Sequence, residues 1–248
     1  MVNIERHYET PAGVVRALDG VSFEITQGER VILLGPSGSG KTTLIDILCG
    51  LYLPDRGAVY INNTPLNDYL MEDWRRNIGY VSQEDNLITG TIKENIVMNN
   101  PEATDVEIYE AAKIAGIDHY ISNLPNNYMT LIRENGENFS GGQKKRVAIA
   151  RAIINKPKIV VFDETTWNVE NKIEKEIIAK LKRHTSDITI IVITHPLTNI
   201  NIADKVIVLN DGKVLNLSQY SKIYNDNEVS LIKQINKRVC HVRNDLST

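Results

Sequence analysis

The sequence has few cysteines, no excess of basic residues and no long apolar run, and each shortage excludes a class of protein. Its 248 residues include only Cys49 and Cys240, too few for a disulfide framework, so we expect a reducing compartment. A formal net charge of -3 argues against general nucleic-acid binding. The longest apolar runs, such as residues 190–193, are strand-sized, and the first residues lack the apolar core of a signal peptide. We therefore expect a soluble chain that depends on another polypeptide if it works at a membrane.

Length and composition favour one α/β domain over residues 1–248. The 42% hydrophobic and 24% charged residues are ordinary for a globular protein. Apolar, strand-like runs occupy residues 30–34, 158–162, 188–193 and 205–209. A helical pattern at residues 171–184 separates two of these runs, which indicates a βαβ crossover and a parallel sheet.

Local patterns predict further elements. Residues 21–25 alternate apolar and polar side chains, as a half-buried strand does. Between residues 84 and 155 the apolar positions fall mostly at helical spacing, so we expect a helical insertion there. Residues 210–213, Asn-Asp-Gly-Lys, are a strong hairpin signal. The polar tail from residue 219 onward is expected to be helical and peripheral.

A glycine-rich loop follows the strand-like run at residues 30–34 and precedes a helical pattern. It consists of Gly35, Pro36, Ser37, Gly38, Ser39, Gly40, Lys41 and Thr42. Glycines let backbone N–H groups converge on phosphate, and the N-terminus of the following helix adds a favourable dipole. In such a loop the lysine reaches the β- and γ-phosphates, and the Thr hydroxyl ligates Mg²⁺. This segment, which we call the phosphate loop, therefore predicts a site for a nucleoside triphosphate and Mg²⁺.

A second glycine-rich element opens another helical pattern far downstream. It consists of Ser140, Gly141, Gly142 and Gln143. By itself this element could be a flexible turn that happens to precede a helix. However, it too can aim backbone N–H groups at phosphate, and one ATP seldom needs two such elements from one chain. We therefore expect each ATP to lie between the phosphate loop of one copy and the Ser-Gly-Gly-Gln element of another.

Two carboxylates, Asp163 and Glu164, end the apolar run at residues 158–162. Ligands bind at the carboxyl ends of the strands in a parallel sheet, so these groups should face the phosphates. Asp163 fits a role in holding Mg²⁺, and Glu164 fits a general base that polarises the attacking water. The alternative is a solvated acidic turn.

With these motifs the chain resembles the nucleotide-binding domain of ATP-binding cassette transporters over nearly its whole length. The resemblance implies a P-loop NTPase (RecA-like) core with an antiparallel β subdomain and an inserted helical subdomain at about residues 84–155. Ser140 to Gln143 matches the family's signature motif. Gln83 matches the glutamine loop, which senses Mg²⁺ and contacts the membrane domain, and His195 matches the switch histidine at the γ-phosphate. Tyr8 is the candidate for stacking on adenine, and Thr43 joins the expected nucleotide-binding residues.

Each match also has an ordinary reading. A lone glutamine is usually a surface residue, a lone histidine at a strand end is usually a satisfied polar group, and Tyr8 could be a core aromatic. The chain departs from the family pattern at Phe139, which replaces a leucine, and at residues 167–170, Trp-Asn-Val-Glu, where Ser-Ala-Leu-Asp is usual. The second departure puts in doubt the coupling of the two ATP sites and the symmetry of the dimer.

Segments around the motifs look exporter-like; they are residues 85–96, 124–128, 134–138 and 195–198. The resemblance implies an ATPase that uses ATP and Mg²⁺ to power export of a peptide, lipid or small hydrophobic compound. It also implies a transmembrane partner domain, on a separate chain or a missing segment, and a homodimer or heterodimer formed through ATP at the cytoplasmic face of the membrane. Two alternatives remain: a soluble cassette ATPase acting on ribosomes or DNA, and a regulatory module that binds ATP without turnover.

Overall fold

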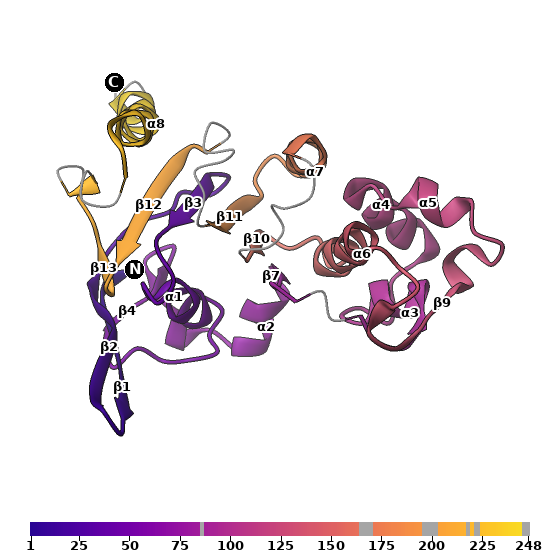
Figure 1. Cartoon of the computed structure of the whole chain (residues 1–248), viewed down its shortest axis with the longest axis horizontal. Coiled ribbons are helices and arrows are strands. Elements are labelled where there is room, and N and C mark those ends of the chain that lie inside the picture. The colour runs from indigo at the N-terminus through magenta and orange to yellow at the C-terminus, as the bar shows by residue number, and fades with distance from the viewer. Residues whose placement is uncertain (85–86, 164–170, 195–202, 217–218, 221–223, 245–248) are drawn as a thin grey trace. The chain divides into compact units, whose positions relative to one another are not determined.

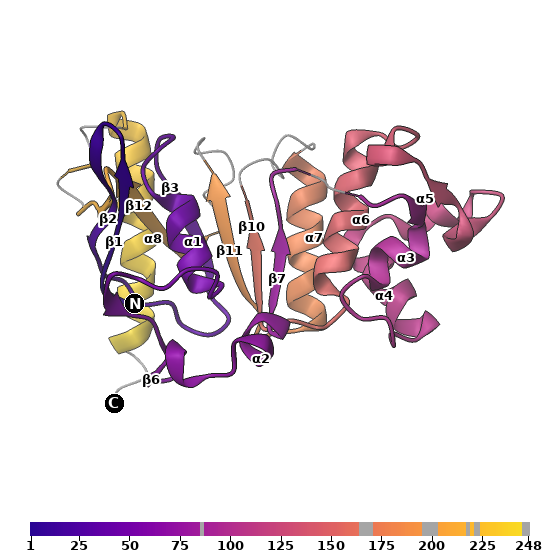
Figure 2. The same ribbon diagram turned by 90° about the horizontal axis from the view of Figure 1, so that it is seen from below.

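The computed structural model describes residues 1–84, 87–163, 171–194, 203–216, 219–220 and 224–244. The chain divides into a first unit, Met1–Arg75 with Thr189–Thr248, and a second unit, Arg76–Ile188. Figures 1 and 2 label the main helices and strands of the two units. Across the described ranges, no helix combines the length and the apolar character needed to cross a membrane.

An antiparallel sheet forms one part of the first unit. β1 (Val2–Thr10) and β2 (Gly13–Val21) form a long hairpin, and β4 (Arg56–Ala58) pairs with the other edge of β1. The prediction of a strand at residues 21–25 is wrong, because β2 ends at Val21. Phe23 still exchanges hydrogen bonds with the backbone of Met1, which lies outside β1, and residues 22–26 belong to no strand.

Parallel strands form the other part of this unit. β3 (Arg30–Leu34) lies between β11 (Thr189–Thr194) and β12 (Lys205–Asn210) and pairs in parallel with both. β13 (Lys213–Val214) turns back on β12 through Asp211 and Gly212, whose φ angles are 45° and 71°. The predicted strands and the predicted hairpin turn are therefore confirmed here. Left-handed backbone at two successive residues is the reason why an Asp-Gly pair suits this turn.

Two helices lie on opposite sides of β12 (Figure 1); they are α1 (Lys41–Leu48) and α8 (Asp226–Asn244). Leu44, Ile45 and Leu48 of α1 line a small apolar cavity with side chains from the parallel strands, namely Val31, Leu33, Ile191 and Ile207. In α8, Val229, Ile232 and Ile235 are buried.

The helix α8 is not peripheral, which corrects our expectation for the tail. The Asn236 side chain exchanges two hydrogen bonds with the backbone of Val206, at 2.9 and 3.0 Å. A strand edge leaves backbone groups unpaired, and this amide satisfies two of them on β12. Val229, Ile232 and Ile235 therefore lie on one buried face of the helix, although the tail as a whole is polar. Between β4 and the second unit the first unit adds β5 (Tyr60–Ile61), β6 (Thr64–Pro65), a 3-10 turn (Leu66–Asp68) and α2 (Met71–Arg76).

The second unit pairs β7 (Ile78–Val81) in parallel with β10 (Ile159–Phe162). Its helices are α3 (Ile92–Val97), α4 (Asp105–Ala115), α5 (Asp118–Ser122), α6 (Gly141–Ile153) and α7 (Asn171–His184). Two short strands, β8 (Gly90–Thr91) and β9 (Leu131–Ile132), and 3-10 turns at Asn127–Met129 and Glu134–Gly136 complete it. α6 is the central helix, because it packs against α3, α4 and β7.

A buried polar network ties α3 to α6. Asn95 is fully buried, and its side chain bonds the backbone of Ile88 in both directions and the carbonyl of Thr91. Arg151 of α6 donates to the Asn95 carbonyl and to its Oδ1, at 2.8 and 2.7 Å. Burial lowers the pKa of Arg151 from its ordinary value. Because unpaired polar groups are costly in such a place, this network holds Ile88 and the start of α3 against α6.

Candidate functional site

The phosphate loop of the first unit is packed so closely that side chains are excluded at two of its glycines. A Cβ at Gly35 would lie 2.2 Å from the Leu209 carbonyl oxygen, and one at Gly40 would lie 2.3 Å from the Ala17 carbonyl oxygen. Gly40 is also the residue before α1, with φ of 99°. The backbones of β2 and β12 therefore lie directly against the loop, and only glycine fits at these two positions.

Lys41 lies within this loop. It is 4% exposed, and its Nζ donates to the carbonyls of Gly35 and Pro36 at 2.8 and 2.9 Å. Thr42 and Thr43 follow in the first turn of α1, Thr42 exposed and Thr43 half-buried, while Pro36, Ser37 and Gly38 are exposed at the rim of the loop. An ammonium group beside a glycine-lined helix N-terminus is a donor set that fits phosphate.

Tyr8 lies on β1 next to an ordered cation. The Arg6 guanidinium is 5.0 Å from the centroid of the Tyr8 ring and 5.7 Å from that of Tyr52. Asp55 accepts from Arg6 at 2.7 Å and from the His7 backbone at 2.6 Å. The His7 N–H, followed by Arg6, holds the pKa of the Asp55 carboxyl below its usual value. The Tyr8 ring is therefore held by a cation–π contact and is not a core aromatic, since it stays half-buried.

Asp163 and Gln83 lie at the carboxyl ends of neighbouring strands in the second unit. Asp163 directly follows β10 and is 8% exposed, and its Oδ2 accepts a hydrogen bond from Tyr80 at 2.6 Å. Gln83 comes shortly after β7 and is exposed. No group of three or more His, Cys, Asp or Glu side chains within the described part could hold a metal ion. A metal here would need phosphate oxygens as further ligands, which is the usual mode for Mg²⁺.

The Ser-Gly-Gly-Gln element caps α6. The Ser140 hydroxyl accepts from the Gln143 N–H at 3.3 Å, and the Gln143 side chain accepts from the Ser140 N–H at 2.8 Å. This reciprocal capping box makes the element an ordered helix start. A Cβ at Gly141 or Gly142 would meet nothing within 4 Å, and neither has a left-handed φ.

These glycines therefore have no local reason in the fold. A helical glycine costs about 0.5–1 kcal/mol relative to alanine, and here neither space nor backbone conformation requires one. The start of α6 thus has a bare surface, with open space where side chains at these two positions would lie.

The structure also shows residues that the motifs did not indicate. Arg6 could have been found from the alternation of β1, which puts it on the same face as Tyr8. Tyr80 and Lys145 could not have been found from the sequence, because each forms a hydrogen bond with a residue far away in the chain. Glu164, His195 and the Trp-Asn-Val-Glu segment at 167–170 lie outside the described residues.

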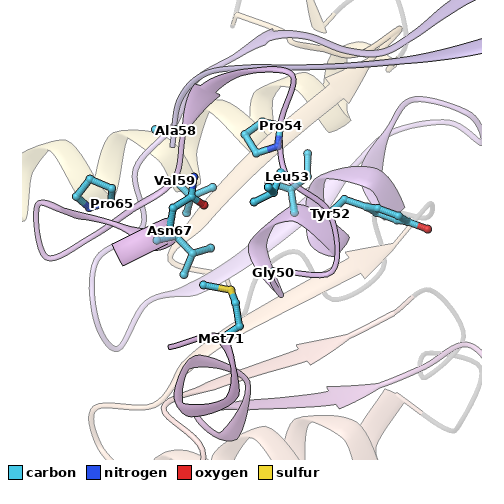
Figure 3. A pocket seen from close by; sticks show the side chains of 11 residues that line it. Gly50, Tyr52, Leu53, Pro54, Ala58, Val59, Pro65, Asn67 and Met71 are labelled. Carbon is cyan, nitrogen blue, oxygen red and sulfur yellow. The ribbon is translucent and has the colours of Figure 1, made fainter. Parts of the chain in front are cut away.

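An apolar hollow lies elsewhere in the first unit, between the end of α1 and the start of α2 (Figure 3). Its lining includes Gly50, Leu53, Pro54, Val59, Leu66 and Met71. Leu53 is 62% exposed, and Leu51 and Leu70, which are adjacent in the sequence to the lining residues Gly50 and Met71, are 58% and 74% exposed. An exposed aliphatic side chain such as Leu53 in an apolar hollow is typical of a contact surface.

Comparison with known proteins gives one family. The sequence model described as "ABC transporter" matches residues 18–167. An uncharacterized ABC transporter ATP-binding protein, YfiB, of Bacillus subtilis (strain 168) is 39% identical over 213 residues, which cover 86% of this chain and 37% of that protein. The mitochondrial iron–sulfur clusters transporter ABCB7 of Homo sapiens is 38% identical over 208 residues, covering 84% and 28%.

A solved structure agrees with these relatives. A bacterial Atm1-family ABC exporter with ATP bound matches with a TM-score of 0.82 and 33% identity, covering 92% of this chain and 40% of that one. The expected fold, a mixed α/β ATPase with parallel core strands and an antiparallel subdomain, is confirmed by this match. The chain spans 28% to 40% of the length of these three relatives.

Proposed function

Since this chain belongs to the ABC transporter family and is an ATPase domain of that family, we propose that it drives export across a membrane by hydrolysing ATP between two copies of itself. The bare start of α6 is the observation that supports this most directly. Gly141 and Gly142 leave the helix N-terminus open to a ligand that this chain does not supply. The phosphate loop of a second copy would carry that ligand.

The proposed roles follow from the chemistry of the residues and from the family motifs that they match. Lys41 and the loop N–H groups hold the β- and γ-phosphates of ATP, and the Thr42 hydroxyl and Asp163 hold Mg²⁺ with Gln83. Oxygen donors of this kind together with phosphate fit Mg²⁺. Glu164 polarises the attacking water, and His195 contacts the γ-phosphate. Catalysis would rest on positioning and electrostatic stabilisation more than on covalent chemistry.

We propose that Tyr8 stacks on the adenine. Its ring is half-buried on β1, and Arg6 already contacts the ring by a cation–π interaction. An aromatic ring that is fixed before the base arrives loses little conformational freedom when stacking occurs. The Asp55 carboxylate, which binds both Arg6 and the His7 backbone, is therefore part of the support of this site.

The transmembrane partner would dock on the apolar hollow of Figure 3, where Leu53 is 62% exposed. The relatives are much longer than this chain, and one is described as an ABC exporter, which supports the proposal of a partner domain in the working assembly. That partner would hold the chain at the cytoplasmic face of a membrane. The cargo class, a peptide, lipid or small hydrophobic compound, is proposed by family analogy alone.

Light scattering of the Glu164→Gln variant with and without ATP tests the composite site. Removing the base should trap bound ATP, so the variant should change from monomer to dimer when ATP is added. Lys41→Ala in the same background is the matched control and should stay monomeric. If the Glu164→Gln variant binds ATP and remains a monomer, the homodimer is wrong and the second half of the site comes from another chain. Steady-state ATPase activity of the unmodified chain separates the regulatory alternative, which would show binding without turnover.

A further inference from the structure

The end of β7 orients Asp163 through two contacts. The Asp163 N–H donates to the Val81 carbonyl at 3.0 Å and so extends the pairing of β10 with β7 by one residue. Tyr80 lies opposite Val161 in the same register, and its hydroxyl donates to Asp163 Oδ2 at 2.6 Å. Backbone and carboxylate of Asp163 are therefore both held by the strand that leads to Gln83.

Because Asp163 is buried, the hydrogen bond that it accepts from the Tyr80 hydroxyl matters for its carboxylate. Asp163 is 8% exposed, whereas Tyr80 is 39% exposed. A carboxylate that has lost most of its water depends on its remaining donors, and an ionised carboxylate can only accept. Within the described part of the chain, no hydrogen bond is made to Oδ1. With Oδ2 engaged by Tyr80, Oδ1 is the oxygen left for a metal ion or its water.

A further contact fixes the strand end that carries Tyr80. Lys145 of α6 is 3% exposed, and its Nζ donates to the Ser82 carbonyl at 3.3 Å. Ser82 lies between Val81 and Gln83, so its backbone cannot shift without breaking this partly buried bond. The Tyr80 hydroxyl is thus presented from a backbone that α6 and β10 both hold.

We infer that Tyr80 is a positioning residue that orients the Asp163 carboxylate toward the Mg²⁺ of bound MgATP. The inference rests on the proposed function, in which Asp163 holds Mg²⁺. Groups that hydrogen-bond a metal-ligating carboxylate typically change metal affinity or activity about 10- to 100-fold when they are removed. Tyr80→Phe deletes the hydroxyl and keeps the ring, so the packing of the ring is retained.

Calorimetric titration of ATP, once with Mg²⁺ and once with EDTA, tests this role without relying on turnover. The gain in ATP affinity caused by Mg²⁺ should fall about 10-fold in Tyr80→Phe, while the affinity in EDTA stays that of the unmodified chain. Tyr109→Phe is the matched control, because Tyr109 is 46% exposed on α4 of the same unit, and it should change neither value. ATPase activity against Mg²⁺ concentration should show a higher half-maximal Mg²⁺ with the same plateau.

The outcomes are distinguishable. An unchanged Mg²⁺ gain in Tyr80→Phe overturns the inference, and so does a lower ATPase plateau with an unchanged Mg²⁺ requirement, which is what a merely structural role would produce. If Mg²⁺ does not strengthen ATP binding even in the unmodified chain, the metal role of Asp163 fails and the inference fails with it. Failure of the whole proposed function would appear differently, as absence of ATP-driven dimers in Glu164→Gln.

Discussion

Replacing either glycine at the start of α6 by alanine should stabilise the protein and impair its function. A Cβ at Gly141 or Gly142 meets nothing within 4 Å, and neither glycine has a left-handed φ. Gly→Ala at such a position stabilises by about 0.4–1 kcal/mol, mainly because the unfolded chain loses freedom. For a chain of this size that corresponds to a rise in Tm of roughly 1–4 °C.

The same methyl group should weaken the ATP-bound dimer. In the proposed sandwich the helix start faces the phosphates carried by the other copy, and a methyl forced into a packed contact costs about 1–3 kcal/mol. That is roughly a 5- to 150-fold loss of dimer affinity. The assay combines thermal unfolding of the nucleotide-free variants with light scattering in the Glu164→Gln background with ATP.

Gly116→Ala is the matched control, because a Cβ there also meets nothing within 4 Å but the backbone has a φ of +72°. A left-handed alanine costs about 1–2 kcal/mol, so this variant should lower the Tm and leave the dimer intact. Gly141→Ala and Gly142→Ala would then raise the Tm and weaken the dimer, whereas Gly116→Ala would lower the Tm and leave the dimer unchanged. If the Gly141→Ala and Gly142→Ala proteins dimerise with ATP like the parent, the composite site is wrong. If their Tm falls, the conclusion that the fold does not require glycine at these positions is wrong.

Three further predictions concern binding, stability and pH. Lys41→Met should weaken ATP binding at least about 10-fold, because it removes the charged donor; calorimetry showing parental affinity would contradict this. Asn95→Ala should lower the free energy of unfolding by about 2–4 kcal/mol in denaturant titration, because the Ile88 backbone and Arg151 lose buried partners; a loss below about 0.5 kcal/mol would show that the network matters little. Backbone and side-chain donors of the α3 cap hold the pKa of Glu94 below its ordinary value of 4.5. The ionised Glu94 side chain therefore stabilises the fold above pH 4.5, and this stabilisation is lost as the pH falls through the lowered folded-state pKa. The Tm difference between the parent and Glu94→Gln should accordingly shrink as the pH falls below 4.5. A Tm difference that stays constant with pH would disprove the coupling.

The motifs that identify the family are local, and for that reason they could be predicted. A phosphate loop needs a strand, glycines and a helix start in succession, and β3, the loop and α1 follow in that order. The cap of α6 is local too, since Ser140 and Gln143 satisfy each other within one turn. The strand at residues 21–25 and the peripheral tail were predicted wrongly, because the end of β2 and the burial of α8 depend on segments far away in the chain.

The sequence by itself thus determined the chemical groups of the site, the order of its elements and the family. Only the tertiary structure shows that position 35 must be glycine, because the Leu209 carbonyl lies where a Cβ would be. Only the tertiary structure also shows that the Tyr80 hydroxyl contacts Asp163. Both depend on the register of strands that are distant in the chain. Register follows from burial and pairing across the whole sheet, whereas a motif reports only the conformation and the chemistry of its own few residues.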